Sequence, residues 1–159
     1  MINDILGYLE NDGVMVLDLC CGQGRHTLSL AQKYPRVKFH GHDQSDYLID
    51  LAQKRNTHKN ARFTVGDCRE IPAEKQFDLV LLMGNSFGYF ENDEGDVRVL
   101  EEIQRVLKVG GVLCVDLTDG EFMRGFDERS WEWIDKTTFT CRQRELSEDG
   151  HRYIHIQFI

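Results

Sequence analysis

Short apolar runs recur along most of the chain, and a turn or a polar segment follows each of them. Their length and composition are typical of buried strands, whereas most of the segments between them space apolar residues three or four apart, as helices do. The predicted strands are Val14–Leu17, Val37–Gly41, Ala61–Val65, Phe77–Met83 and Val112–Leu117. Strands that alternate with helices predict an α/β fold with a doubly wound, mostly parallel sheet. We expect the strand order 3-2-1-4-5, in which the winding reverses between the first and fourth strands.

The predicted helices each carry one apolar stripe that packs on this sheet. Pro35 ends the helix after the first strand, and Ser45 caps a helix over 46–55. Asn92 begins the last helix, because the acidic residues after it suit the amino terminus of a helix, and Gly110-Gly111 ends it. The apolar positions are Ile2, Ile5, Leu6 and Leu9 before the first strand, then Leu28, Ala31 and Tyr34, then Leu48, Leu51 and Ala52, and finally Val97, Leu100, Ile103 and Leu107.

The pattern changes after residue 119. Thr137–Leu146 has the composition of a strand, Ser147–Gly150 is typical of a turn, and apolar and polar residues alternate along His151–Ile159. We therefore predict a C-terminal antiparallel hairpin, with a core domain over 1–119 and a hairpin extension over 120–159. Because the chain stops inside an apolar strand, we expect a fragment, a shortened relative, or a hairpin that pairs with another chain as a homo-oligomer.

The composition, with 41% hydrophobic and 29% charged residues, is that of an ordinary globular protein. No apolar run approaches the roughly 20 residues of a membrane-spanning helix, and the first residues lack the pattern of a signal peptide, so we expect a soluble cytoplasmic protein without a membrane partner. The 19 Lys and Arg against 27 Asp and Glu give a net charge of −8, which disfavours nucleic acid as a partner. Five scattered cysteines without a CxxC pair predict reduced thiols.

Residues with binding chemistry gather in the turn after the first strand. Asp18 ends the strand, and Gly22 and Gly24 precede the next helix. Glycines let a ligand approach the backbone closely, and the free N–H groups at the start of a helix face whatever binds there. The turn therefore predicts a nucleotide site. Thr27 stands where a dinucleotide fingerprint has its third glycine, which argues against NAD.

The segment Asp18–Gly24 resembles motif I of the class I S-adenosylmethionine-dependent methyltransferases, which have a Rossmann-like fold and the pattern acid, any, glycine, any, glycine, any, glycine. Asp18, Gly22 and Gly24 match this pattern, while Cys20 replaces its first glycine. The stretches DLCCGQGRH and GNSFGYF are also similar to a group of small-molecule methyltransferases. The resemblance covers about residues 1–158, and family members of this kind are longer than this chain.

The resemblance implies S-adenosyl-L-methionine as the cofactor and a role for each matching residue. Asp43 follows the second strand near the spacing at which doubly wound folds present a carboxylate to a ribose. Asp67 would accept from the adenine amino group, and the backbone N–H of Cys68 would donate to the ring. Asp18 would reach the methionine amino group and Arg25 its carboxylate. The expected cofactor-binding residues are Asp18, Cys20, Gly22, Gly24, Arg25, Asp43, Gln44, Asp67, Cys68, Met83 and Gly84.

The segment Gly84–Phe90 follows the fourth strand and faces the glycine turn across the predicted cleft. Asn85, Ser86 and Tyr89 are the expected substrate-side residues, because they offer hydrogen bonds and a ring face suited to a sulfonium cation. The transfer would be an in-line displacement that depends mainly on alignment, so no catalytic residue is predicted. If the acceptor needs a base, Tyr89, Asn85 and His26 are the nearest candidates. Asp116 and Asp119, after the fifth strand, are substrate contacts or solvated acids.

Alternatives to this hypothesis stay open. His40 and His42 lie two apart on a strand, which suits metal ligation, but no third ligand with suitable spacing follows, so we expect no metal site. The main hypothesis is methyl transfer to a small-molecule acceptor. The alternative is a non-catalytic module that binds S-adenosylmethionine and serves as an interaction partner, and an NAD-dependent oxidoreductase is the third.

Overall fold

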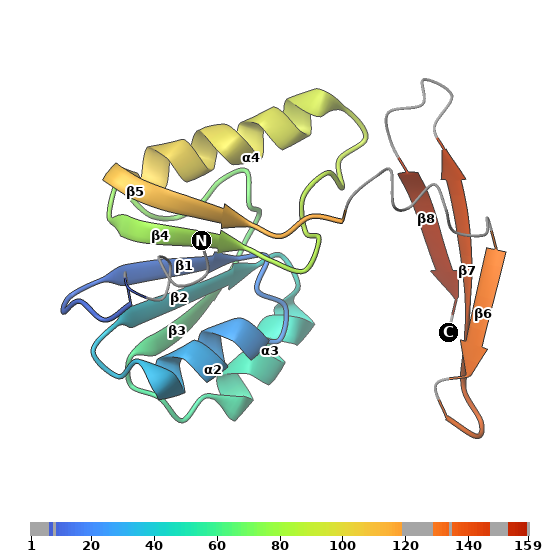
Figure 1. The fold of residues 1–159 in the computed structure, drawn as a ribbon, viewed down its shortest axis with the longest axis horizontal. Helices are drawn as coiled ribbons and strands as arrows, with labels where there is room; N and C mark the ends of the chain where they lie inside the picture. The colour runs from blue at the N-terminus through green and yellow to red at the C-terminus, as the bar shows by residue number, and fades with distance from the viewer. Residues whose placement is uncertain (1–6, 8, 119–128, 134, 147–152, 159) are drawn as a thin grey trace. The chain divides into compact units, whose positions relative to one another are not determined.

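The structure is a computed structural model that describes residues 7, 9–118, 129–133, 135–146 and 153–158. The chain divides into two compact units, Met1–Leu117 and Thr118–Ile159. Strands β1 to β5 and helices α2 to α4 belong to the first unit, and strands β6 to β8 to the second (Figure 1). The stripe predicted over residues 2–9 lies outside the described residues, except for Leu9, which is buried. None of the described helices has the length and apolar character that crossing a bilayer requires.

The first unit is built on a five-stranded parallel sheet. Its strands are β1 (Met15–Leu19), β2 (Lys38–Asp43), β3 (Ala61–Val65), β4 (Phe77–Leu82) and β5 (Leu107–Val115), and its helices are α2 (Arg25–Lys33), α3 (Asp46–Arg55) and α4 (Asp93–Val106). The order β3-β2-β1-β4-β5 confirms the predicted doubly wound fold. Because the strands are parallel, the loops that follow them leave from the same edge of the sheet.

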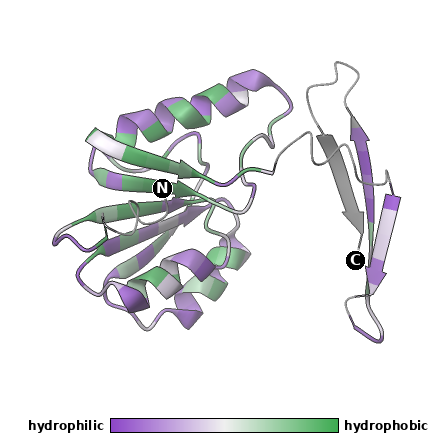
Figure 2. Cartoon of the chain, in the orientation of Figure 1, coloured by the Kyte–Doolittle hydropathy of each residue, from purple (hydrophilic) through white to green (hydrophobic). Residues whose placement is uncertain are grey.

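Helices cover both faces of this sheet. Figure 1 shows α2 and α3 on one face and α4 on the other. Side chains alternate along a strand, so Val16 packs in the cluster that includes Ala31 and Ile49, whereas Leu17 packs in the cluster that includes Ile103. Figure 2 shows hydrophobic residues along β4, in the middle of the unit, and alternating hydrophobic and hydrophilic positions along the helices.

Helix α4 buries only part of the predicted stripe. Ile103 is buried as predicted and Leu107 is half-buried, whereas Val97 and Leu100 are 51% and 42% exposed. Val99, Glu102 and Val106 are buried in their place. The side chains of Val97 and Leu100 line a groove of about 600 Å³ together with residues of β5. The predicted end of the helix is also wrong. Helix α4 ends at Val106 because Leu107 has an extended backbone and begins β5, and Gly110, at a φ of 79°, lies in that strand where its register with β4 shifts.

The second unit is a three-stranded antiparallel sheet in the order β6-β7-β8. Its strands are β6 (Arg129–Trp133), β7 (Phe139–Leu146) and β8 (Tyr153–Phe158). The predicted hairpin is confirmed as β7 and β8, whereas its turn over 147–150 lies outside the described residues. Strand β6 was not predicted from the sequence. In it, the centre of a Trp133 ring lies 5.3 Å from the centre of the Phe139 ring.

Candidate functional site

The turn between β1 and α2 has a left-handed backbone at three positions. Cys20, Gly22 and Gly24 have φ angles of 57°, 54° and 76°. This conformation suits glycine but costs roughly 1–2 kcal/mol for a residue with a Cβ, so its surroundings must hold Cys20 there. Gly24 is also required by packing, since a Cβ on it would lie 2.7 Å from the ring of Phe63. The space beside Gly22 is open, because a Cβ there would meet only Leu48, at 4.0 Å.

Asp43, at the end of β2, fastens this turn to the next helix. Its Oδ2 accepts from the backbone N–H of Gly22 at 2.8 Å, and its Oδ1 accepts from the N–H of Ser45 at 2.9 Å. Ser45 caps α3, as predicted, by accepting from the N–H of Leu48 at 3.3 Å. A carboxylate has about four acceptor sites, so each oxygen of Asp43 keeps the capacity for a ligand hydroxyl.

Asp18 is 1% exposed and serves the start of α2. Its Oδ2 accepts from the Thr27 hydroxyl at 2.6 Å and from the Thr27 backbone N–H at 3.1 Å. Burial raises the pKa of Asp18 above its usual 3.8, and the hydrogen bond from the Thr27 hydroxyl opposes this change. Thr27 therefore has a structural reason to stand where the dinucleotide fingerprint has glycine. Contact between Asp18 and a ligand stays a prediction.

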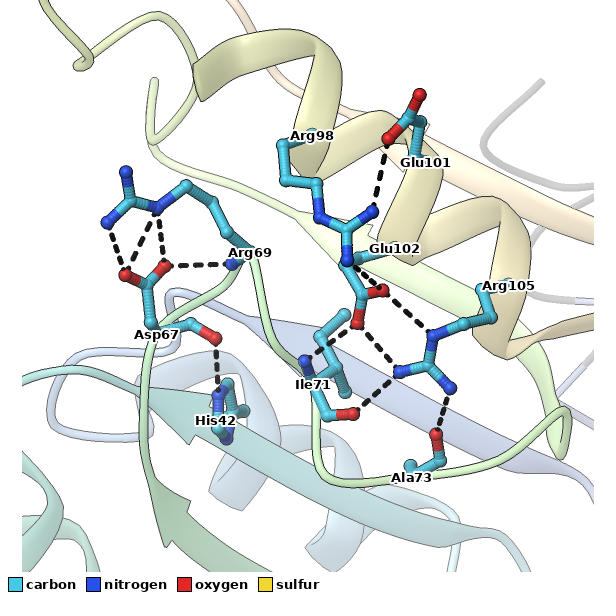
Figure 3. Close-up of polar contacts among 9 residues, drawn as sticks. All are labelled: His42, Asp67, Arg69, Ile71, Ala73, Arg98, Glu101, Glu102 and Arg105. Atoms are coloured by element: carbon cyan, nitrogen blue, oxygen red, sulfur yellow. Dashed lines mark hydrogen bonds and ion pairs between the residues drawn. The ribbon is translucent and has the colours of Figure 1, made fainter. Parts of the chain in front are cut away.

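Asp67 lies in the loop after β3 and is held by Arg69 (Figure 3). Oδ1 of Asp67 accepts from the Arg69 backbone N–H at 2.8 Å and from Nε at 3.0 Å. Oδ2 accepts from Nε at 3.1 Å and from Nη2 at 2.5 Å. These bonds hold the pKa of Asp67 below its usual 3.8. Arg69 is not among the residues predicted from the sequence, although a basic residue two positions after the acid is a local signal that could have indicated this pair.

Two buried histidines support the same loop from β2. Nε2 of His42 lies 3.3 Å from the backbone oxygen of Asp67, which can only accept, so His42 donates from Nε2 (Figure 3). Its Nδ1 then accepts from the Thr64 hydroxyl at 2.9 Å, and the same oxygen accepts from Nε2 of His40 at 2.7 Å. Burial lowers the pKa of His42, and burial with the nearby Arg62 charge lowers that of His40 to about 4. Both rings are therefore neutral donors at neutral pH.

The predicted HxH pair thus has a structural role. Among the residues that the structure describes, no group of three or more His, Cys, Asp or Glu side chains is placed to hold a metal ion. Gly66 is also fixed by this arrangement, since a Cβ on it would lie 2.7 Å from the His42 ring. The backbone of the Asp67 loop therefore packs directly on β2.

The thiols of Cys20 and Cys68 join the loops after β1 and β3. The side chains of Cys20 and Cys68 interact, and this interaction together with burial raises the pKa of Cys20. Both side chains pack against the same hydrophobic cluster as Leu19 and Ile71. This contact supplies a reason for a cysteine at the strained position that the family pattern gives to glycine.

The segment after β4 is braced by β5. Gly84 and Asn85 have left-handed backbones, with φ angles of 71° and 59°. The Gly84 N–H donates to Oδ2 of Asp116 at 3.3 Å, and the Asn85 N–H donates to the backbone oxygen of Asp116 at 3.2 Å. The Ser86 hydroxyl donates to the Met83 carbonyl at 2.7 Å. Tyr89 is 76% exposed. Asp116 therefore positions the expected substrate-side segment, and Asp119 lies outside the described residues.

A buried carboxylate anchors the chain between β3 and β4 (Figure 3). Glu102 of α4 is 3% exposed and accepts from the backbone N–H of Ile71 at 2.9 Å. Its oxygens also accept from Nε and Nη2 of Arg105 at 2.8 and 2.7 Å, and Arg105 in turn donates to the backbone oxygens of Ile71 and Ala73, each at 2.7 Å. Glu102 does not stand out in the sequence, because its partner Ile71 lies far away along the chain.

The remaining expected residues lie around the same edge of the sheet. Arg25 begins α2 and is exposed, and Gln44 follows β2 and is exposed. Asp18, Asp43 and Asp67 come from β1, from β2 and from the loop after β3, which are neighbours in the sheet. Burial is the main cause that raises the pKa of Asp18, and the charge of Asp43 adds to it.

A parallel sheet with a glycine turn after its first strand and acids after the next two defines a nucleotide-binding α/β domain. The comparisons with known proteins make this class more specific. The family model described as a methyltransferase domain matches residues 16–111. This chain therefore belongs to the methyltransferase domain family.

Individual relatives agree with this assignment. The chain is similar to a cypemycin N-terminal methyltransferase of Streptomyces (36% identity over 75% of this chain and 49% of the relative). It is also similar to a demethylmenaquinone methyltransferase of Lactococcus lactis (38% identity, 65% of this chain and 42% of the relative). It therefore spans about half or less of the length of these curated relatives. An S-adenosylmethionine-dependent methyltransferase of Clostridium acetobutylicum shares the fold (TM-score 0.78, 18% identity, 99% of this chain and 69% of that one).

Proposed function

We propose that this chain forms the cofactor-binding part of an S-adenosyl-L-methionine-dependent methyltransferase that acts on a small-molecule acceptor. The observation that carries the proposal is the turn after β1, in which left-handed residues leave the Gly22 backbone open while Asp43 holds it in place. The family match and the names of the relatives support the same cofactor and reaction. The two relatives are named for different acceptors, so the acceptor is not fixed by the fold.

The residues present fit an adenosyl ligand. Asp43 keeps acceptor capacity for the ribose hydroxyls, with the exposed Gln44 beside it. Asp67 offers the acceptor for the adenine amino group, and the N–H of Cys68 is the donor next to it. For the methionine part, the open space beside Gly22 permits close approach to the backbone, Asp18 offers an acceptor for the amino group, and Arg25 offers a cation for the carboxylate.

The cofactor would supply an electrophilic methyl group on a sulfonium, and the protein would align it with the acceptor. Met83 and Gly84 lie where β4 meets its loop, and Asn85, Ser86 and Tyr89 follow on the expected substrate side. The bonds from Asp116 hold this segment in a defined conformation. Alignment and exclusion of water are the main requirements of an in-line displacement, so the proposal needs no dedicated base.

The test is calorimetric titration with S-adenosyl-L-homocysteine. Asp43→Ala removes a charged acceptor, and we expect it to weaken binding by about 1–3 kcal/mol. Asp50→Ala is the matched control, because Asp50 lies on the exposed side of α3 and pairs with Lys54. Equal affinities of wild type and Asp43→Ala would refute the ribose role. Transfer of an isotope-labelled methyl group to a metabolite extract then distinguishes an enzyme from a module that only binds the cofactor.

A further inference from the structure

Arg69 is partly exposed, yet its side chain is held in place by contacts with Asp67 and Phe90. Its guanidinium and backbone N–H together donate four hydrogen bonds to Asp67, and the side chains of the two residues are 42% and 38% exposed. The guanidinium carbon also lies 4.5 Å from the centre of the Phe90 ring, in the segment between β4 and α4. The planar fork is therefore clamped between a carboxylate and a ring, which fixes its orientation.

Asp67 is fixed from its other side as well. His42 donates to its backbone oxygen, and the ring of His42 leaves no room for a side chain at Gly66. The backbone and the carboxylate of Asp67 are thus held by different groups. The single Nε–H of Arg69 is shared between Oδ1 and Oδ2, so three N–H groups make the four contacts and a carboxylate with about four acceptor sites keeps one in a defined direction.

We propose that Arg69 is a specificity-determining positioning residue, which holds Asp67 as a pure hydrogen-bond acceptor so that the site takes a 6-aminopurine and rejects a 6-oxopurine. This inference rests on the proposed function, because it assumes that Asp67 faces the purine. An ionised carboxylate accepts a hydrogen bond from an exocyclic amino group. It repels a 6-oxo group, because both oxygens are then acceptors with no proton between them. A protonated carboxyl could instead donate to that oxygen, and the guanidinium beside Asp67 disfavours the protonated form.

The chemistry predicts how discrimination responds to Arg69. The hydrogen bonds of Arg69 lower the pKa of Asp67, whereas burial raises it. The backbone N–H of residue 69 still donates to Asp67, but without the guanidinium the largest influence that opposes burial is lost, so the carboxyl takes up a proton more readily as a ligand covers it. The ratio of affinities for the two purines should then fall, and it should fall further at lower pH.

The experiment compares S-adenosyl-L-homocysteine with S-inosyl-L-homocysteine, its 6-oxo counterpart, by calorimetry between pH 5 and 8. Sites built for one hydrogen-bond pattern reject the mismatched group strongly, so we expect the wild type to prefer the amino ligand by about 100-fold or more at each pH. Arg69→Met keeps the stem and removes the fork, and it should reduce this preference at least about tenfold, most at low pH. Arg69→Lys, which keeps the charge without the fork, should restore part of it.

Two further variants separate this role from a general effect on folding. Phe90→Leu leaves the bonds to Asp67 in place and removes only the ring, so the preference should fall by roughly two- to fivefold. Arg98→Met changes an exposed arginine of α4 that pairs with Glu101 and Glu102, and the preference should not change. Thermal unfolding of each variant shows whether it is folded.

The outcomes are distinguishable. If Arg69→Met weakens both ligands equally and keeps their ratio, Arg69 has only a structural role and the inference is overturned while the proposed function stands. If the wild type binds both ligands without preference, the adenine role of Asp67 fails and the inference fails with it. If the wild type binds neither ligand, the proposed function itself is overturned.

Discussion

Replacing Glu102 tests whether α4 holds the loop between β3 and β4. Glu102→Ala would remove an acceptor from the buried N–H of Ile71, which is 3% exposed and so cannot turn to water. An unsatisfied buried donor costs about 1–3 kcal/mol. Arg105 loses its partner too, but its side chain is 45% exposed and it keeps its bonds to Ile71 and Ala73, so this loss adds only about 0.5–1 kcal/mol. We therefore expect a decrease of about 1.5–4 kcal/mol in the free energy of unfolding.

The assay is urea denaturation followed by the helical signal in far-UV circular dichroism. The described helices all belong to the first unit, whereas both tryptophans lie in β6, so tryptophan fluorescence would follow the other unit. Glu102→Gln keeps an oxygen for the Ile71 N–H and loses only the charge, so we expect about half the effect. Glu101→Ala, on the same helix but with a side chain 58% exposed, should stay within about 0.5 kcal/mol of the wild type.

The pH dependence gives a second measurement on the same variants. The hydrogen bonds from Arg105 hold the pKa of Glu102 below its usual 4.5. A carboxyl with a lowered pKa in the folded state contributes stability above its unfolded pKa and loses it as the pH falls through the folded pKa. The difference between wild type and Glu102→Ala should therefore be full at neutral pH and shrink below about pH 4.5. If Glu102→Ala costs no more than Glu101→Ala at neutral pH, α4 does not support the loop as described.

Two other substitutions test the packing around the site. Gly24→Ala and Gly13→Ala both place a Cβ at a φ of 76°, but only the Cβ at residue 24 would clash, at 2.7 Å from Phe63. In urea denaturation Gly24→Ala should therefore lower the free energy of unfolding by about 1–3 kcal/mol more than Gly13→Ala does. Equal losses would contradict the packing argument. The amide nitrogen of Asn60 donates to three backbone oxygens that end α2 and begin β2, at 2.9–3.1 Å. Asn60→Asp keeps the shape of the side chain but turns a carboxylate toward these backbone oxygens, so at neutral pH it should destabilise the protein more than Asn60→Ala does. In acid, where the carboxylate is protonated, the two variants should become similarly stable. The opposite order of stability would be inconsistent with these bonds.

Local patterns were sufficient to predict the sheet and several of its supports. The apolar runs gave the five parallel strands, and Ser45 was predicted as the cap of α3 from residue type and position alone. Strand pairing follows from the doubly wound topology, which leaves few arrangements open once strands and helices alternate. The prediction failed in part for α4, because its apolar residues lie on two sides and periodicity cannot say which side meets the sheet.

The candidate site was predictable as a set of positions but not as a set of partners. Asp18, Asp43 and Asp67 lie at or just beyond the ends of β1, β2 and β3, and the sequence marks these strand ends. Their partners include Thr27 for Asp18 and Gly22 for Asp43, and these pairs depend on how the turn folds back on the sheet. The Cys20 thiol likewise meets Cys68 only because distant loops converge. The backbone N–H groups of Gly22, Thr27 and Ser45, which donate to these acids, carry no sequence signal at all.

The loop that carries Asp67 has no helix of its own over residues 66–76, and its anchor, Glu102, is made later than the loop during synthesis. A nascent chain that has left the ribosome only as far as β4 can pair its first strands, yet the predicted adenine contact cannot be set until α4 has followed. Cofactor capture should therefore have to wait for α4, and a chain released before α4 should fold in part without binding.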